Sequence, residues 1–97
     1  MSKSINEVYS LYGLESKGYS IKKMDGEQVL YKDYGKFDIE VSGLDNYRKS
    51  RVSGIVFVWE NKRKVVKNIE YTSFAQLNNI LHKIDTLDLE GILSCDF

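Results

Sequence analysis

The 97-residue sequence contains one cysteine, one histidine and no proline. A lone cysteine, Cys95, cannot form an internal disulfide, so we expect a reducing, intracellular setting and a cytoplasmic location. A zinc site needs several ligands from His, Cys and carboxylates, so His82 and Cys95, in different elements, predict no metal centre. No apolar run approaches the length of a membrane span, and the first residues form no hydrophobic signal segment, so we expect no membrane association.

Sequence motifs of common catalytic sites are also missing. There is no Gly-x-Ser-x-Gly nucleophile elbow and no glycine-rich phosphate loop. Cys95 lies near the C-terminus without a visible activating base, which predicts a passive thiol. Asp38 and Glu40 alternate with apolar residues, so we expect them on the solvent side of a strand. The sequence therefore predicts a protein that is not an enzyme and needs no cofactor.

The most apolar segment, residues 54–60, is the expected centre of the fold. Hydrophobic residues make up 42% of the chain and charged residues 29%, which favours one globular domain over residues 1–97. Residues 54–60 are rich in the β-branched and aromatic side chains that suit a strand. Ile55, Phe57 and Trp59 would point to one side and Val56 and Val58 to the other, and both sides are apolar. We therefore predict an inner strand covered on both faces, with Phe57 buried.

Period-two patterns surround this segment. Residues 19–24, 28–32 and 37–42 alternate between polar and apolar side chains, with turn signals at residues 25–26 and 33–36, and predict an antiparallel meander. In the third strand we expect Phe37, Ile39 and Val41 to face the core. Residues 64–71 follow a turn at residues 61–63 as a further strand, which would place Trp59 close to Lys64 or Val65.

Helical patterns lie at the two ends of the chain. Ser4 and Glu7 form a capping box before an apolar stripe, which predicts a short helix over residues 5–12. Ser73 and Gln76 form a second box before the clearest stripe, which consists of Phe74, Leu77, Ile80, Leu81 and Ile84. The tail allows a short helix over residues 86–93 or a final edge strand, and we favour the helix. We predict an α+β fold, with an antiparallel sheet of about five strands, a C-terminal helix packed on one face and a short N-terminal helix.

Charge is distributed unevenly although 14 basic and 14 acidic residues balance. Residues 43–67 hold seven bases and two acids, whereas residues 68–97 hold one base and five acids. Such asymmetry indicates contact with nucleic acid or with an acidic protein surface, although basic residues also keep hairpin tips soluble. The candidate binding residues lie in the loop before the inner strand and at the tip after it: Tyr47, Arg48, Lys49, Arg51, Lys62, Arg63 and Lys64.

Two functions are compatible with these features. The first is a non-catalytic protein-binding module or inhibitor that docks on a larger host or phage protein through the basic loop and hairpin. Small size, seven tyrosines and a proline-free composition are typical of phage or mobile-element accessory proteins, including anti-defence and anti-CRISPR inhibitors, although no family motif is present. The alternative is a nucleic-acid-binding protein in which Tyr47 or Trp59 stacks on bases beside the basic hairpin. A pI near 6.6 disfavours this alternative. The sequence does not indicate an oligomeric state.

Overall fold

The computed structural model describes residues 13–24, 26–44 and 53–97. Within them the elements follow in this order: β1 (Ser20–Met24), β2 (Glu27–Asp33), β3 (Phe37–Val41), β4 (Gly54–Glu60), β5 (Lys64–Tyr71), α2 (Phe74–Asp85) and α3 (Leu89–Ser94). An antiparallel sheet followed by helices confirms the predicted α+β class. The predicted helix over residues 5–12 lies outside the described residues.

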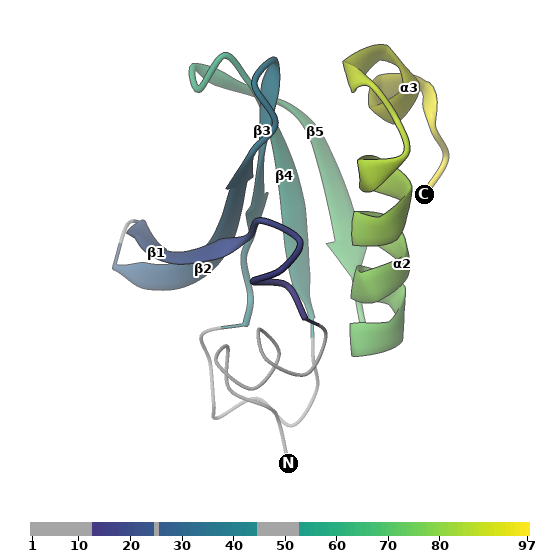
Figure 1. Ribbon diagram of the computed structural model, residues 1–97. Coiled ribbons are helices and arrows are strands. Elements are labelled where there is room, and N and C mark those ends of the chain that lie inside the picture. Colours follow the sequence, from purple (N-terminus) through teal and green to yellow (C-terminus); the bar gives the residue numbers. More distant parts are fainter. Residues whose placement is uncertain (1–12, 25, 45–52) are drawn as a thin grey trace.

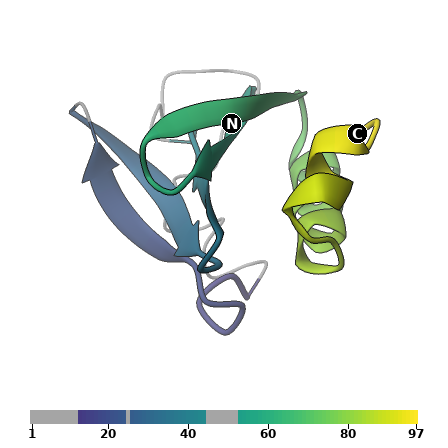
Figure 2. The ribbon, with the colours of Figure 1, turned by 90° about the horizontal axis from the view of Figure 1, so that it is seen from above.

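The five strands form one meander in which every strand pairs with its neighbour in the chain. Their order in the sheet is β1-β2-β3-β4-β5 and all pairs are antiparallel. The sheet is strongly twisted, so the β1–β2 hairpin turns well away from β5 (Figure 1, Figure 2). The predicted local hairpins are therefore confirmed, and Trp59 pairs with Val65 rather than with Lys64.

Strand β4 is an inner strand, as predicted, but its two faces differ in burial. Val56 and Val58 are fully buried on the face that packs toward α2. Ile55, Phe57 and Trp59 on the other face are only half-buried, so the prediction that Phe57 is buried is wrong. The reason is that the helices of the described residues, α2 and α3, cover only one face of the sheet.

Strand β3, at the centre of the sheet, is buried along its whole length. Phe37, Ile39 and Val41 join the hydrophobic core as predicted. Asp38 and Glu40, expected in solvent, are only 2% and 9% exposed. That expectation is wrong because β3 is flanked on both sides by strands whose large side chains extend over its second face.

Helix α2 closes the core against one face of the sheet. The side chain of Ser73 caps the helix by accepting a hydrogen bond from Gln76 N–H at 3.1 Å. Its predicted apolar stripe is confirmed. Phe74 is partly buried, and the other four residues of the stripe are buried: Leu77, Ile80, Leu81 and Ile84. The tail forms helix α3, as favoured, but the helix begins only at Leu89 because the Asp88 side chain caps it at Gly91 N–H.

Candidate binding face of the sheet

The face of the sheet opposite the α2-packed face combines aromatic rings with buried carboxylates. Cross-strand pairing places Asp38 opposite Trp59 on β4, and Glu40 opposite Tyr31 on β2 and Phe57 on β4. Residues directly opposite each other in antiparallel strands project to the same face. These five side chains therefore share one surface, which we call the Trp59 face.

Both carboxylates on β3 accept hydrogen bonds from neighbouring aromatic side chains. Nε1 of Trp59 donates to Oε1 of Glu40 at 3.0 Å, and the hydroxyl of Tyr31 donates to Oδ2 of Asp38. Burial, the hydrogen bond to Asp38 and nearby carboxylate charge all raise the pKa of the Tyr31 hydroxyl. Tyr31 therefore stays protonated near neutral pH and keeps donating to Asp38.

Within the part of the chain that the structure describes, neither Asp38 nor Glu40 forms an ion pair with a lysine or arginine. The ion pairs found among the described residues join other groups: Lys32–Asp85, Lys62–Asp33 and Lys64–Glu60. Burying a charge without an opposite charge is costly. Local rules of this kind are broken mainly at functional sites, so two such carboxylates on one strand favour a binding role.

Two hollows open on the Trp59 face, and Met24 and Trp59 line both of them. The first, about 310 Å³ in volume, is the basic-rimmed hollow, whose other lining residues are Lys22, Tyr31, Asp38 and Lys62. The second, about 320 Å³ in volume, is the acidic hollow, whose other lining residues are Glu27, Glu40, Ser42, Phe57 and Val65. Met24 belongs to β1 and Trp59 to β4, so the twisted β1–β2 hairpin curves toward β4 on this face.

The cations at the basic-rimmed hollow already have partners within the chain. Nζ of Lys22 lies 4.2 Å from the centre of the Tyr31 ring, a cation–π contact. Nζ of Lys62 lies 2.8 Å from Oδ2 of Asp33. The hydrogen bond from Lys62, together with one from Gly35 N–H, lowers the pKa of Asp33. The hydrogen bond to Asp33 in turn raises the pKa of Lys62.

Only one of the predicted tip residues reaches the Trp59 face. Asn61 and Lys62 adopt positive φ angles of 53° and 60° in the β4–β5 turn, and Lys62 lines the basic-rimmed hollow. Lys64 lies 3.8 Å from the Glu60 carboxylate, an exposed contact of little energetic value. Arg63 is exposed and lines neither hollow. The structure therefore does not gather the three tip cations into one site.

The predicted loop residues lie outside the described residues: Tyr47, Arg48, Lys49 and Arg51. Their place relative to the Trp59 face is therefore a prediction that the structure does not test. His82 is exposed on α2. No group of three or more His, Cys, Asp or Glu side chains suited to a metal ion occurs in residues 13–24, 26–44 and 53–97.

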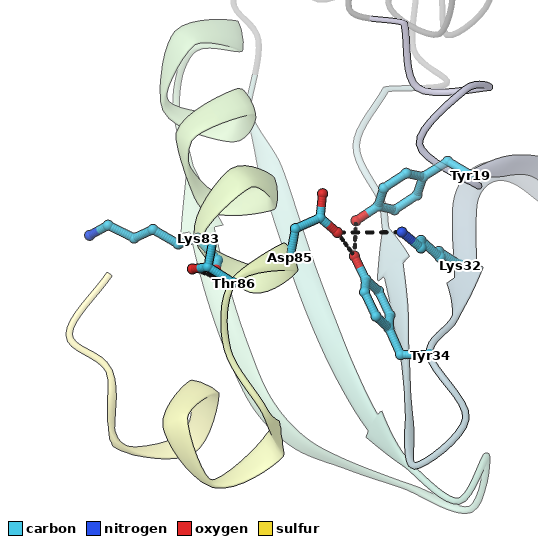
Figure 3. A network of polar contacts seen from close by, with 6 residues as sticks. All are labelled: Tyr19, Lys32, Tyr34, Lys83, Asp85 and Thr86. Carbon is cyan, nitrogen blue, oxygen red and sulfur yellow. Dashed lines mark hydrogen bonds and ion pairs between the residues drawn. The ribbon is translucent and has the colours of Figure 1, made fainter.

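A second polar cluster joins the sheet to the end of α2 (Figure 3). Oδ1 of Asp85 accepts a hydrogen bond from the Tyr34 hydroxyl at 2.5 Å and lies 3.3 Å from Nζ of Lys32. The hydroxyls of Tyr19 and Tyr34 lie 3.3 Å apart, and the Tyr34 ring stacks on Phe37 at 4.7 Å. Since its members satisfy one another and join separate elements, we assign this cluster a structural role.

Lys67 holds the C-terminal segment against β5 in a comparable way. Its Nζ donates to the carbonyl oxygens of Cys95 at 2.6 Å and of Leu93 at 3.3 Å, and it lies 5.2 Å from the centre of the Phe97 ring. A cation at these carbonyls completes the C-terminus of α3. Cys95 is half-buried at this junction, which agrees with a structural environment for the thiol.

Comparison with known proteins found no matching family, no matching curated protein and no matching solved structure. Among the described residues, neither helix combines the length and the hydrophobicity that crossing a bilayer requires. The candidate site therefore rests on the geometry of the Trp59 face alone.

Sequence reasoning missed most of the Trp59 face. The sequence pattern places Asp38 and Glu40 in solvent and does not single out Tyr31, and the only binding role that it assigns to Trp59 is stacking on nucleic acid. One signal could have found the site: Asp38 and Glu40 are two residues apart in the middle strand of a five-strand meander. Side chains on a middle strand have cross-strand neighbours on both sides, whereas those on an edge strand have a neighbour on one side only.

Proposed function

We propose that this protein is a small, non-catalytic protein-binding module that docks on a larger protein through the Trp59 face. The observation that carries the proposal is the pair of buried carboxylates, Asp38 and Glu40, which lie among aromatic rings and form no ion pair in the described chain. An inhibitor of the phage or mobile-element type would act in this way, by occupying a surface of its target.

The composition of the Trp59 face suits a protein interface. Aromatic residues and methionine are enriched at the centres of such interfaces, and Trp59, Phe57, Tyr31 and Met24 supply them here. Hollows on such a surface receive anchor side chains of the partner, which contribute most of the binding free energy. Val65, at the edge of the acidic hollow, is 38% exposed and extends the apolar area.

Nucleic acid is the weaker alternative for this face. Lys22 and Lys62 beside Tyr31 and Trp59 offer cations and stacking surfaces. The carboxylate of Asp38 lines the same hollow, however, and repels phosphate. Each of the two lysines also has a partner within the chain, which weakens its attraction for a polyanion.

Two matched variants test the proposal in an affinity capture from host lysate with and without nuclease. Val65 and Leu93 are similarly exposed apolar residues, at 38% and 41%, but only Val65 lines a hollow of the Trp59 face. We expect Val65→Lys to lose a protein partner that the wild type and Leu93→Lys both retain, with nuclease making no difference. Thermal melts establish that both variants are folded.

Two results would overturn the proposal. Equal capture of the same partners by Val65→Lys and Leu93→Lys would show that docking does not use the Trp59 face. A signal that nuclease removes from all three proteins would favour the nucleic-acid alternative.

A further inference from the structure

We infer that the acidic hollow accepts an arginine side chain of the protein partner. This inference rests on the proposed function, because it names what the partner places on the Trp59 face. Among the residues that the structure describes, those lining the hollow include two carboxylates, Glu27 and Glu40, and no lysine or arginine. Its walls include two aromatic rings, Phe57 and Trp59.

The hydrogen bonds of the two carboxylates leave room for a further donor. One oxygen of Glu40 is held by Trp59 Nε1 at 3.0 Å, and one oxygen of Glu27 by Gly43 N–H at 3.2 Å. Both donors are neutral, and an ionised carboxylate has about four lone-pair sites for acceptance. Each carboxylate therefore keeps acceptor capacity for a cation that enters the hollow.

Arginine fits this environment better than lysine does. Its guanidinium is planar, donates two parallel hydrogen bonds to a carboxylate and stacks on aromatic faces. It is also less strongly hydrated than an ammonium group, so entry into a half-enclosed hollow of about 320 Å³ costs less desolvation. The rings of Trp59 and Phe57 add a cation–π attraction, for which tryptophan is the best of the aromatic residues.

The neighbouring hollow gives the face its charge pattern. Lys22 and Lys62 line the basic-rimmed hollow and repel a second cation there, while Met24 and Trp59 separate the two hollows. A partner segment is therefore directed to place its arginine over Glu40 rather than over Asp38. Opposed charges of this kind fix the register of a complex more than they raise its affinity.

The single tryptophan provides a direct readout of the acidic hollow. Trp59 is the only tryptophan in the chain, so its indole N–H gives one unique signal in a ¹H–¹⁵N correlation spectrum. The probe is the capped tripeptide Gly-Arg-Gly, and the controls are the same peptide with the neutral isostere citrulline and with lysine. We expect a saturable shift of the indole signal with the arginine peptide and roughly tenfold weaker binding of the citrulline peptide.

Two charge-neutralising variants complete the experiment. Glu40→Gln removes a charge from the acidic hollow and keeps the acceptor for Trp59, whereas Glu90→Gln removes an exposed charge on α3. We expect Glu40→Gln to weaken the arginine peptide roughly tenfold and Glu90→Gln to leave its binding unchanged. Thermal melts verify that both variants are folded before titration.

The outcomes separate this inference from the proposed function. No saturable shift, equal binding of the citrulline or lysine peptide, or unchanged binding to Glu40→Gln would each overturn arginine recognition. In those cases a partner that is still lost by Val65→Lys and kept by Leu93→Lys leaves the proposed function standing. If, in addition, Val65→Lys captures the same partners as the wild type and Leu93→Lys, both proposals fail.

Discussion

Trp59 and Glu40 are joined across the β3–β4 pair by a 3.0 Å hydrogen bond from the indole Nε1 to Oε1. The bond holds an aromatic ring beside a carboxylate that is 9% exposed. It therefore pre-positions both groups of the acidic hollow before any partner arrives. Pre-positioning reduces the ordering cost of binding.

The first prediction concerns the stability cost of this arrangement. Glu40→Gln keeps an acceptor for Trp59 and removes a buried charge that no cation of the described chain balances. We expect urea unfolding near neutral pH to show a gain of roughly 0.5–2 kcal/mol, as is common when a functional residue is replaced. A loss of stability would mean that the carboxylate contributes to folding rather than to binding.

The second prediction compares the two faces of the sheet. Ile39 is completely buried in the core, whereas Phe57 is half-buried on the Trp59 face. We expect Ile39→Ala to lower the free energy of unfolding by about 2–5 kcal/mol. Phe57→Ala should lower it by roughly 1–2 kcal/mol, less than for a fully buried phenylalanine. Denaturant melts of both variants compare the two losses of stability. A larger loss for Phe57→Ala than for Ile39→Ala would show that the Trp59 face, and not the α2-packed face, holds the core.

Much of the fold was predictable because its signals are local. Gly26 and Gly35 adopt φ angles of 81° and 95°, and each lies in a hairpin turn that the sequence predicted. The stripe of α2 was equally clear, because its capping serine and apolar spacing occur within one short segment. When each strand forms a hairpin with the next strand in the chain, the order of the strands in the sheet follows the order in the sequence.

The candidate site was not predictable because its burial depends on contacts between distant segments. Alternation in β3 predicts that Asp38 and Glu40 face water, a rule that holds when one face of a sheet is solvated. Here the twisted β1–β2 hairpin carries Met24 toward Trp59, so the second face is partly enclosed. The degree of twist is not encoded in a sequence pattern of period two.

The third prediction concerns the close approach of β4 to the preceding segment. The hydroxyl of Tyr71 donates to the carbonyl oxygen of Ser42 at 2.5 Å directly beside Gly54. A Cβ atom at Gly54 would overlap that carbonyl oxygen and lie 2.5 Å from the Tyr71 hydroxyl. We therefore expect Gly54→Ala to lower the free energy of unfolding by roughly 2–4 kcal/mol.

Gly35→Ala is the matched control for Gly54→Ala. No atom lies within 4 Å of a Cβ at Gly35, so only its positive φ of 95° opposes the substitution. We expect a cost of about 1 kcal/mol in the same denaturant melts. Equal losses in the two variants would show that backbone conformation, and not the Ser42–Tyr71 contact, makes glycine necessary at residue 54.

The last prediction concerns stability at alkaline pH. Burial raises the pKa of Tyr34, and its hydrogen bonds with Asp85 and Tyr19 raise it further. In the unfolded chain a tyrosine ionises near its ordinary pKa of about 10. The folded state therefore binds more protons than the unfolded state above about pH 10, and stability falls there as pH rises. Below that pH the contribution is fully present.

Tyr34→Phe isolates this contribution. The variant loses the hydrogen bond to Asp85, so at neutral pH it should be less stable by about 1 kcal/mol. Its stability should then fall less steeply than that of the wild type as pH rises past about 10, because phenylalanine releases no proton on unfolding. Urea unfolding over this range measures both slopes. Lysine ionisation affects the two proteins alike, so parallel slopes would show that Tyr34 ionises normally in the folded state.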